Sequence, residues 1–484
     1  MSIRNITLAA AITAAIAIST GCNYQEEDDI LMSRRSQEAI ARQQEEEQND
    51  GKDYTIWKFV QNTSAVYYLW NHNVPISYID FSQYESPQAL FESFRDADDR
   101  FSVVLNNYTE TEDAFKNIET TDGINYQLYY DTGSNIAAVV EYVYDGSPAQ
   151  EAGIKRGFVI HKVNGTQLTD ANYADLLSQE TCTYTYSTIE TTGEGDKVSL
   201  SYGNTMTESQ PVTKRRMDIN PILKTSVFVK GGRRIGYFLY DSFTDDTECI
   251  VKTIEKLSAN QIDDLVLDLR LNGGGYINTL DTLASMLVPE GNVGKLFLTE
   301  NYNNLMTSEL RKETQNRDFN KHYFAANLPN AGLSRLFVLT SRHSASASEE
   351  LISGLMPYMP VTIIGETTYG KFTSNYLVHD TKDIGNDDDG IPYNEWAVYI
   401  CVASCTNAAD EMNFKNGFTP DHKVADIYQH ELGDENEPLL NTALNLCAGS
   451  LAKSATQQPA PLDGYIGHYG KTIDRFGLVS KKIK

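Results

Sequence analysis

The chain has 484 residues, of which 41% are hydrophobic and 10% aromatic, so it can bury more than one globular core. It carries 40 Lys and Arg against 66 Asp and Glu, a net charge of −26, which argues against a nucleic-acid partner because phosphate backbones attract basic proteins. The six cysteines are widely spaced and indicate neither a disulfide framework nor a zinc site.

The N-terminus has the pattern of an export signal. Arg4 precedes an apolar run over residues 6–18, and small residues follow it up to Cys22, which predicts a signal peptide over residues 1–21. Gly21 and Cys22 resemble the lipid-attachment site of bacterial lipoproteins. This resemblance implies a cell-envelope protein that is held in the outer membrane by lipid on Cys22, facing either the periplasm or the cell surface. Secretion into the periplasm without lipid is the alternative.

The next two segments differ sharply in composition. Residues 22–52 are acidic and rich in Gln with almost no aromatics, so they cannot bury a core and are expected to form a tether. Residues 53–116 place apolar side chains at helical spacing, and Ser86 followed by Pro87 is typical of a helix start. We therefore expect a small helical N-terminal domain over residues 53–116.

Residues 117–211 alternate like a small β-domain. The spacing of Gly, Pro and Ala over residues 146–165 resembles that of a PDZ domain. A PDZ groove adds an extended peptide to a sheet edge, and the resemblance implies that four residues form its carboxylate-binding loop. They are Gly123, Ile124, Asn125 and Tyr126. Asn125 departs from the PDZ pattern, which has glycine there, and a helix around residues 174–177 is expected to line the groove.

Residues 212–449 alternate apolar strands with helices, which indicates an α/β core. One buried strand over residues 264–269 leads into Arg270 and then to the triple glycine at residues 273–275. Glycines of this kind let backbone N–H groups approach a ligand closely, as an oxyanion hole requires. A phosphate loop is excluded because no Gly-Lys-Ser/Thr follows.

The stretch from Thr340 to Asn375 reads as a strand end, a serine-rich turn, a helix and a second strand. A hydroxyl at such a turn lies beside the free N–H groups of a helix start, where negative charge can be stabilised. The alternative is structural, because Ser346 or Ser348 followed by acidic residues is also a common helix cap. The residues alone leave both interpretations open.

A family resemblance favours the catalytic interpretation. The motifs S-A-S-A-S-E, G-E-x-x-x-G-K and D-L-R-x-N-x-G-G are similar to those of the C-terminal processing (tail-specific) serine peptidases. The resemblance implies a ClpP/crotonase-like α/β core with an inserted or preceding PDZ-like domain. It implies that Ser346 is the nucleophile and that Lys371, 25 positions later, is the base. It also implies an oxyanion hole formed by Gly274 and Ala347.

The same resemblance suggests a weak point at the base. Asn375 stands where the family often has a glutamine that orients the lysine amine, and Phe372 stands where glycine is usual. Lysine accepts a proton only when it is neutral, and an ion pair of Lys371 with Glu366 or Glu349 would keep it charged.

These observations predict an extracytoplasmic serine endopeptidase with a Ser-Lys dyad that cleaves unfolded or C-terminal segments of proteins. We expect no cofactor, no metal and no nucleic acid. The acidic loop over residues 381–390 is better explained as a solvated turn than as a calcium site. Two alternatives remain, namely an inactive peptide- or ligand-binding lipoprotein and a scaffold that only presents the PDZ-like domain. Residues 450–484 are expected to form a peripheral C-terminal extension without an assigned role.

Overall fold

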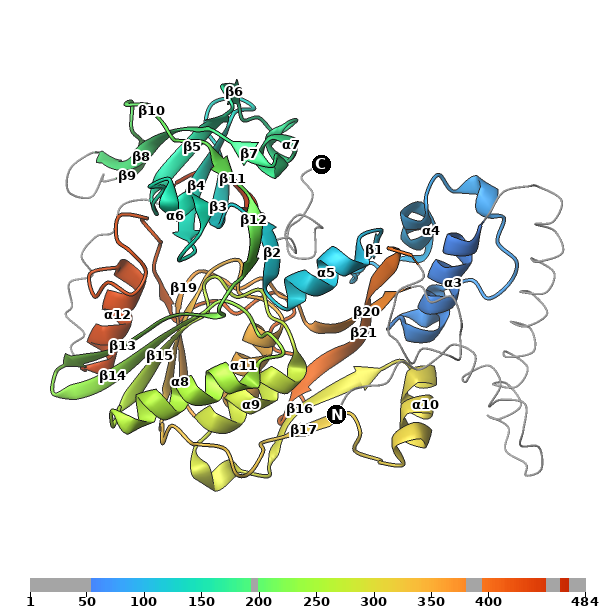
Figure 1. Ribbon diagram of the computed structural model, residues 1–484. Helices are drawn as coiled ribbons and strands as arrows, with labels where there is room; N and C mark the ends of the chain where they lie inside the picture. The colour runs from blue at the N-terminus through green and yellow to red at the C-terminus, as the bar shows by residue number, and fades with distance from the viewer. Residues whose placement is uncertain (1–53, 193–198, 380–393, 450–461, 470–484) are drawn as a thin grey trace, which may run out of the picture. The chain divides into compact units, whose positions relative to one another are not determined.

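The computed structural model describes residues 54–192, 199–379, 394–449 and 462–469. The predicted signal peptide, the tether with Cys22 and the acidic loop over residues 381–390 lie outside these ranges. The chain divides into two units, each assembled from segments that are distant in the sequence (Figure 1). Within the described ranges, no helix combines the length and the apolar character needed to cross a bilayer.

The smaller unit combines residues up to 112 with residues 300–320 and 373–404. Its helices and strands have the following bounds: α3 (Thr55–Tyr67), η1 (Asn71–Asn73), η2 (Phe81–Gln83), α4 (Pro87–Phe94), β1 (Val103–Leu105), α10 (Asn304–Thr314), β20 (Thr373–His379) and most of β21 (Ala397–Asn407). β1 pairs antiparallel with residues 397–399 of β21, and β20 pairs antiparallel with residues 397–404 of the same strand. The predicted helical domain over residues 53–116 is therefore wrong in its limits, because strands from much later in the chain complete this unit.

The helix start predicted at Ser86 is confirmed. Ser86 is the N-cap of α4, and its Oγ accepts a hydrogen bond from the N–H of Ala89 at 3.1 Å. Pro87 occupies the first helical position, where its missing N–H has no cost and its fixed φ suits the helix. Leu90, Phe91 and Phe94 then form the buried face.

The larger unit contains a six-stranded sheet in the order β13-β14-β15-β18-β19-β22, in which all neighbours except β13 and β14 are parallel. Its strands have these bounds: β13 (Ile222–Lys230), β14 (Arg233–Tyr240), β15 (Asp264–Asp268), β18 (Leu336–Thr340), β19 (Val361–Gly365) and β22 (His422–Lys423). The central strands are buried on both faces, which explains their near-continuous apolar runs. The predicted α/β core is confirmed.

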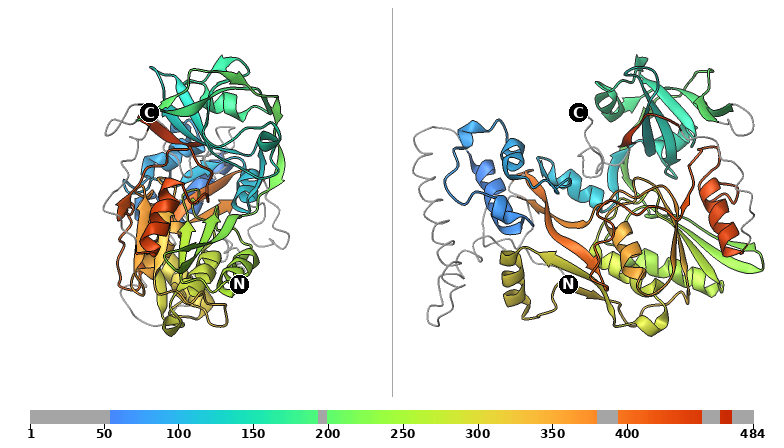
Figure 2. Two further views of the ribbon diagram at one scale, coloured as in Figure 1. Left: turned by 90° about the vertical axis from the view of Figure 1, so that its left-hand side faces the viewer. Right: turned by 180° about the vertical axis from the view of Figure 1, so that it is seen from behind.

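Helices cover both faces of this sheet. α12 (Pro438–Cys447) packs on one face, and α8 (Thr247–Ala259), α9 (Ile277–Leu287) and α11 (Ala347–Leu355) lie on the other (Figures 1 and 2). The η4 turn (Glu290–Asn292) follows α9, and β16 (Leu296–Tyr302) pairs with β17 (Lys321–Tyr323). The closing helix begins at Pro438 because Glu437 caps it, accepting from the N–H groups of Leu439 and Leu440 at 3.3 and 2.9 Å.

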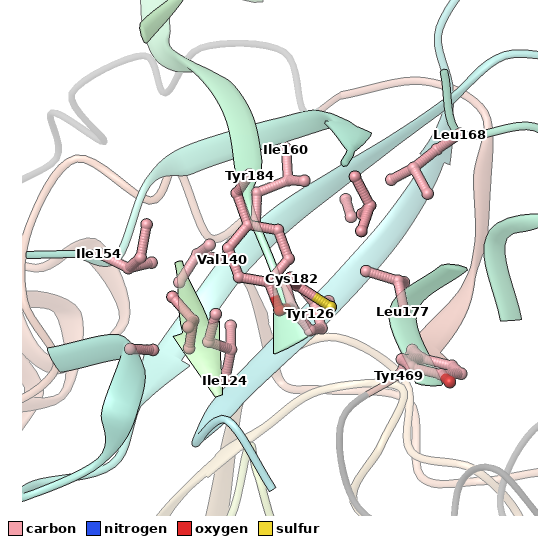
Figure 3. Close-up of a cluster of buried hydrophobic side chains, with 14 of the residues drawn as sticks. Ile124, Tyr126, Val140, Ile154, Ile160, Leu168, Leu177, Cys182, Tyr184 and Tyr469 are labelled. Atoms are coloured by element: carbon pink, nitrogen blue, oxygen red, sulfur yellow. The ribbon is translucent and has the colours of Figure 1, made fainter. Parts of the chain in front are cut away.

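A β-domain precedes the core within the same unit. Its main sheet has the order β10-β8-β5-β4-β3-β23, with β6 and β9 paired to β5 and β8. The chain enters this unit within α5 (Tyr108–Phe115). The elements of the β-domain have these bounds: β2 (Ile118–Thr121), β3 (Ile124–Tyr130), β4 (Ile136–Val143), α6 (Pro148–Glu151), β5 (Phe158–Val163), β6 (Thr166–Gln167), α7 (Tyr173–Ser178), β7 (Thr181–Cys182), β8 (Tyr184–Thr192), β9 (Ser199–Tyr202), β10 (Thr207–Glu208), β11 (Val212–Thr213) and β12 (Arg215–Asp218). Figure 3 shows its buried cluster, in which Leu177 of α7 lies on the side of Cys182 and Tyr126, and Val140 and Ile160 lie farther into the sheet.

The outermost strand of this β-domain comes from the C-terminal extension. β23 (Tyr465–Tyr469) pairs antiparallel with β3 and appears in Figure 2, right, as a red strand against the blue-green sheet. The expectation of a wholly peripheral extension is therefore wrong for residues 465–469. Tyr465, Ile466 and Tyr469 are residues that favour strands, but the partner strand lies more than three hundred residues earlier in the chain.

Buried polar contacts join the β-domain to the core. Tyr144 donates its hydroxyl to Asp241 at 3.1 Å, and Arg156 donates to the carbonyl of His430 at 2.7 Å and to the carboxylate of Asp426. Burial alone would raise the pKa of Asp426, but Arg156 and a second arginine lower it to about 2.

Candidate active site

Serine hydroxyls hold the turn between β18 and α11 against the end of β15. Ser341, Ser344 and Ser348 donate from their Oγ atoms to the carbonyl oxygens of residues 270, 269 and 272 at 2.6, 2.8 and 3.0 Å. Ser344 is thus a residue of the turn before α11. The prediction of Ser348 as a cap is wrong, because Ser348 lies inside α11 and fastens the glycine loop instead.

Ser346 occupies the remaining position in this turn. It is the N-cap of α11, with φ +55° and ψ −120°, a backbone conformation that side chains other than glycine rarely adopt. Its own N–H donates to Glu349 Oε2 at 3.1 Å, as one half of a capping box. The cap and the strained turn therefore coincide at Ser346, so the two interpretations of the serine-rich turn do not exclude each other.

The glycine loop after β15 touches Ser346 directly. A Cβ atom at Gly274 would lie 2.7 Å from Ser346 Cβ and 3.2 Å from the nitrogen of Ala347, and φ at Gly274 is +109°. Only glycine fits this approach. Ala347 is the first residue of α11, so its N–H has no acceptor within the helix.

Gly274 does not offer an available donor in this conformation. Its N–H donates to Asn272 Oδ1 at 2.9 Å, and the same amide oxygen accepts from Ser348 Oγ at 3.1 Å. The predicted oxyanion hole thus has Gly274 and Ala347 next to each other, but the N–H of Gly274 is already bonded. Asn272 was not predicted as a site residue, although it is part of the D-L-R-x-N-x-G-G motif.

One buried carboxylate joins the two predicted catalytic residues through their backbones. Glu349 Oε2 accepts from the N–H of Ser346 at 3.1 Å and from the N–H of Lys371 at 2.8 Å. Its Oε1 accepts from the N–H of Gly370 at 2.7 Å and from Thr368 Oγ1 at 2.6 Å. Ser346 and Lys371 are therefore anchored to the same side chain.

Burial makes the carboxyl group of Glu349 a weaker acid than usual. Desolvation raises the pKa of Glu349 to about 7, even though all four hydrogen bonds favour the charged form. Glu349 and Glu366 were the two predicted ion-pair partners of Lys371. Glu349 accepts a hydrogen bond from the backbone N–H of Lys371, and Glu366 Oε1 accepts one from Arg342 Nε at 3.1 Å. The Lys371 side chain is 5% exposed.

The segment that carries Lys371 packs on residues 415–417. A Cβ atom at Gly370 would lie 2.7 Å from the carbonyl oxygen of Lys415, and one at Gly417 would lie 2.1 Å from the carbonyl oxygen of Thr368. Both glycines have φ above +75°, so each is required by conformation and by space. These contacts fix the course of the chain into Lys371.

Asn375, the predicted orienter of Lys371, lies on β20 in the smaller unit. Its Oδ1 accepts from Thr373 Oγ1 at 3.1 Å, and its Nδ2 donates to Cys401 Sγ at 3.5 Å. These bonds engage both ends of its amide. Phe372, the other departure from the family pattern, is buried with Lys415 Nζ 5.1 Å from its ring centre.

A pocket opens beside the glycine loop. Residues 273–275 line it together with Ser242, Phe115 and His343. The ring of His343 stacks on that of His468 with 4.1 Å between their centres. No cluster of three potential metal-ligating side chains occurs in the part of the chain that the structure describes.

The D-L-R part of the glycine-loop motif has a structural explanation that the sequence did not reveal. Arg270 is 1% exposed and forms a bidentate pair with Glu437 at 2.9 Å, and its Nε donates to Asp268 Oδ1 at 2.9 Å. This pair joins the end of β15 to the cap of α12. The arginine therefore fixes the strand end from which the glycine loop starts.

The predicted peptide-binding residues lie at the start of β3. Gly123 has φ +89° and packs against Ser147, and the N–H of Ile124 donates to Asp122 Oδ1 at 3.0 Å. The side chains of the other two point inward, since Asn125 Nδ2 donates to the hydroxyl of Tyr144 at 3.0 Å and Tyr126 is 1% exposed. The backbone edge of β3 that faces away from β4 is paired with β23.

Comparison with protein families gives two matches. The model of peptidase family S41 matches residues 234–424, and the model of the peptidase S41 N-terminal domain matches residues 58–103. The first covers the glycine loop, Ser346 and Lys371, and the second lies within the smaller unit.

Individual relatives agree with these matches. The carboxy-terminal processing protease CtpB of Bacillus subtilis is 24% identical over 58% of this chain and 53% of its own length. The chloroplastic C-terminal processing peptidase of Tetradesmus obliquus is 28% identical over 51% of each chain. The chain thus spans about half the length of these curated relatives.

A solved structure from Bacteroides fragilis that is assigned to the S41 proteases superposes with a TM-score of 0.65 and 23% identity. The superposition covers 81% of this chain and 97% of that one. At this level of identity the likeness shows a shared fold.

Proposed function

We propose that this chain, which belongs to peptidase family S41, is a serine endopeptidase in which Ser346 is the nucleophile and Lys371 the general base. The observation that carries the proposal is the Glu349 carboxylate, which binds the backbone N–H groups of both residues. A side chain that anchors a strained serine and a buried lysine together suits a catalytic pair better than a simple helix cap.

The reaction follows from these positions. Ser346 Oγ attacks the peptide carbonyl carbon while its proton passes to the neutral amine of Lys371. The N–H of Ala347 binds the developing oxyanion, and the N–H of Gly274 joins it once its bond to Asn272 is exchanged for the oxyanion. Lys371 then protonates the leaving amine, and water releases the acyl group by the same proton transfers in reverse.

The substrates we propose are unfolded or C-terminal segments of proteins. The names of the B. subtilis and T. obliquus relatives refer to carboxy-terminal processing. An extracytoplasmic location with a lipid on Cys22 completes the proposal, supported by the pattern of the first 22 residues.

The test is cleavage of an unfolded protein by the full chain and two variants. Ser346→Ala and Lys371→Ala are each expected to lower kcat by at least about 1,000-fold. Ser178→Ala and Lys162→Ala replace exposed residues of the same types and are expected to cleave normally. Cleavage that survives in Ser346→Ala would refute the nucleophile assignment.

The alternative of a non-catalytic peptide- or ligand-binding lipoprotein is favoured by one observation, the bonded N–H of Gly274. It predicts that the unmodified chain cleaves no substrate and that Ser346→Ala binds peptides with unchanged affinity. The cleavage assay above separates the two candidates.

A further inference from the structure

The C-terminal strand β23 lies where a peptide ligand of the β-domain would lie. It forms the outer neighbour of β3 and runs antiparallel to it, with Tyr465 opposite Tyr129 and Tyr469 opposite Tyr126. An extended peptide that binds by joining a sheet edge makes these backbone pairings. The C-terminal end of the strand lies beside the loop that begins at Gly123.

The last residue of β23 closes the space between the sheet and α7. The Tyr469 ring lies 6.0 Å from that of Tyr173 and 6.5 Å from that of Tyr126, measured between ring centres. Its hydroxyl donates to the carbonyl of Ala174 at 3.2 Å. Figure 3 shows Tyr469 beside Leu177 at the end of the same buried cluster. We call the space between β3 and α7 the β3/α7 groove.

The same strand contacts the turn that carries Ser346. The guanidinium of Arg342 lies 4.5 Å from the centre of the Tyr465 ring, and His343 stacks on His468. The other side of His468 is fixed to the β-domain, since its Nε2 lies 3.1 Å from Glu141 Oε2. Arg342 and His343 precede Ser346 by four and three positions, and His343 lines the pocket beside the glycine loop.

We propose that residues 465–469 are an intramolecular ligand of the β3/α7 groove, and that an extended polypeptide with an aromatic side chain in the place of Tyr469 binds there by displacing them. Displacement removes His468 and Tyr465 from His343 and Arg342. A bound polypeptide would therefore change the contacts of the catalytic turn. This second consequence rests on the proposed function, whereas occupancy of the groove does not.

The competition has a simple thermodynamic form. An external peptide can bind only the fraction of molecules whose groove is open, so its apparent dissociation constant is the intrinsic one divided by that fraction. A variant that weakens the internal ligand must therefore bind external peptide more tightly. If residues 465–469 only brace the sheet, weakening them gives no such gain.

The binding test uses the full chain with Ser346→Ala, so that no cleavage disturbs it. The probe is a fluorescent peptide with the sequence of residues 462–469, amidated at its C-terminus because the chain continues beyond Tyr469. Tyr469→Ala removes the buried ring and is expected to bind the probe at least about tenfold more tightly in an anisotropy titration. Asp463→Asn changes an exposed residue just before the strand and is expected to bind like the parent.

A milder variant keeps the test valid if Tyr469→Ala fails to fold. Tyr469→Phe retains the ring and loses only the bond to the Ala174 carbonyl, so it is expected to tighten probe binding about fivefold. Equal probe affinity in the parent and in whichever of these variants is folded would overturn the proposal. Probe binding that is unchanged when Leu177, on the α7 side of the groove, is replaced by Asp would also overturn it.

The activity test separates this inference from the proposed function. In the chain with Ser346, Tyr469→Ala is expected to cleave an unfolded protein severalfold faster at substrate concentrations below KM. If no chain cleaves but the gain in probe binding is present, the proposed function fails and the occupied groove remains. If cleavage occurs and the gain in binding is absent, the groove proposal fails alone.

Discussion

At the scale of single residues, Glu349 is the side chain on which the predicted site depends most. Sequence patterns identified it as an acidic residue in the first turn of a helix, which is an ordinary capping feature, and as a candidate ion-pair partner of Lys371. Its burial and its bonds to Gly370 and Lys371 arise because β19 returns the chain to the start of α11. The capping-box spacing was the one sequence signal that could have identified it.

Glu349 is expected to make the folded chain less stable as pH rises, which is the opposite of the usual effect of a carboxyl group. Its pKa is about 7 in the folded chain and near the ordinary value of 4.5 when unfolded, so the folded state binds the extra proton between these values. The free energy of unfolding therefore falls as pH rises from 4.5 to above 7, by at most about 3 kcal/mol.

Urea unfolding of the parent and Glu349→Gln over this range measures the effect, because glutamine does not titrate. As pH rises, the free energy of unfolding of the parent should fall relative to that of Glu349→Gln. Glu248→Gln, on the exposed face of α8, is the matched control and should follow the parent. A pH-independent difference for Glu349→Gln would contradict the assigned pKa.

Gly274 is expected to tolerate no side chain. Alanine there would place its Cβ 2.7 Å from Ser346 Cβ at a φ of +109°, so kcat/KM should fall at least about 100-fold. Gly291→Ala is the control, since a Cβ there meets nothing within 4 Å. Steady-state kinetics on an unfolded protein decides, and near-normal activity in Gly274→Ala would disprove the tight approach.

At the scale of elements, the strand-turn-helix from β18 to α11 and the glycine loop after β15 could be predicted because their signals are local. Apolar runs mark the strands, and Ser, Gly and Glu mark the turns and caps. The pairing of β23 with β3 could not be predicted in this way. Strand pairing depends on which edges remain open in the folded chain, and no local pattern contains that information.

The buried Arg270 is expected to stabilise the junction of β15 with α12. Arg270→Met leaves Asp268 and Glu437 buried without their partner, so the free energy of unfolding should fall by about 3–5 kcal/mol. Arg215→Met breaks an exposed pair with Glu151 and should change stability little. Denaturant unfolding at pH 7 compares them, and equal effects would refute a special contribution of Arg270.

At the scale of the whole molecule, each unit is assembled from segments that the sequence keeps apart. The smaller unit takes strands from residues 373–404, which is why a domain drawn as one interval, 53–116, was wrong. Composition and motifs identified the α/β core and the β-domain because each has a long continuous stretch with one periodicity.

The envelope anchor is tested on the intact chain. Expressed in a bacterium that processes lipoproteins, the mature protein is expected to begin at Cys22 with diacylglycerol on its sulfur, as mass spectrometry of the N-terminal peptide would show. Cys22→Ala should yield unlipidated protein that leaves the membrane fraction. A mature N-terminus at another residue, without lipid, would contradict the anchor.

The polar contacts between the β-domain and the core have a consequence for calorimetry. Asp241 and Asp426 are core carboxylates whose partners, Tyr144 and Arg156, belong to the β-domain. If one part unfolded alone, Asp241 would lose Tyr144, and Asp426 would lose Arg156 and keep Arg270, at a cost of several kcal/mol. The two parts should therefore melt in a single heat-absorption peak. Excising the β-domain should lower the melting temperature of the core rather than release an intact catalytic fragment.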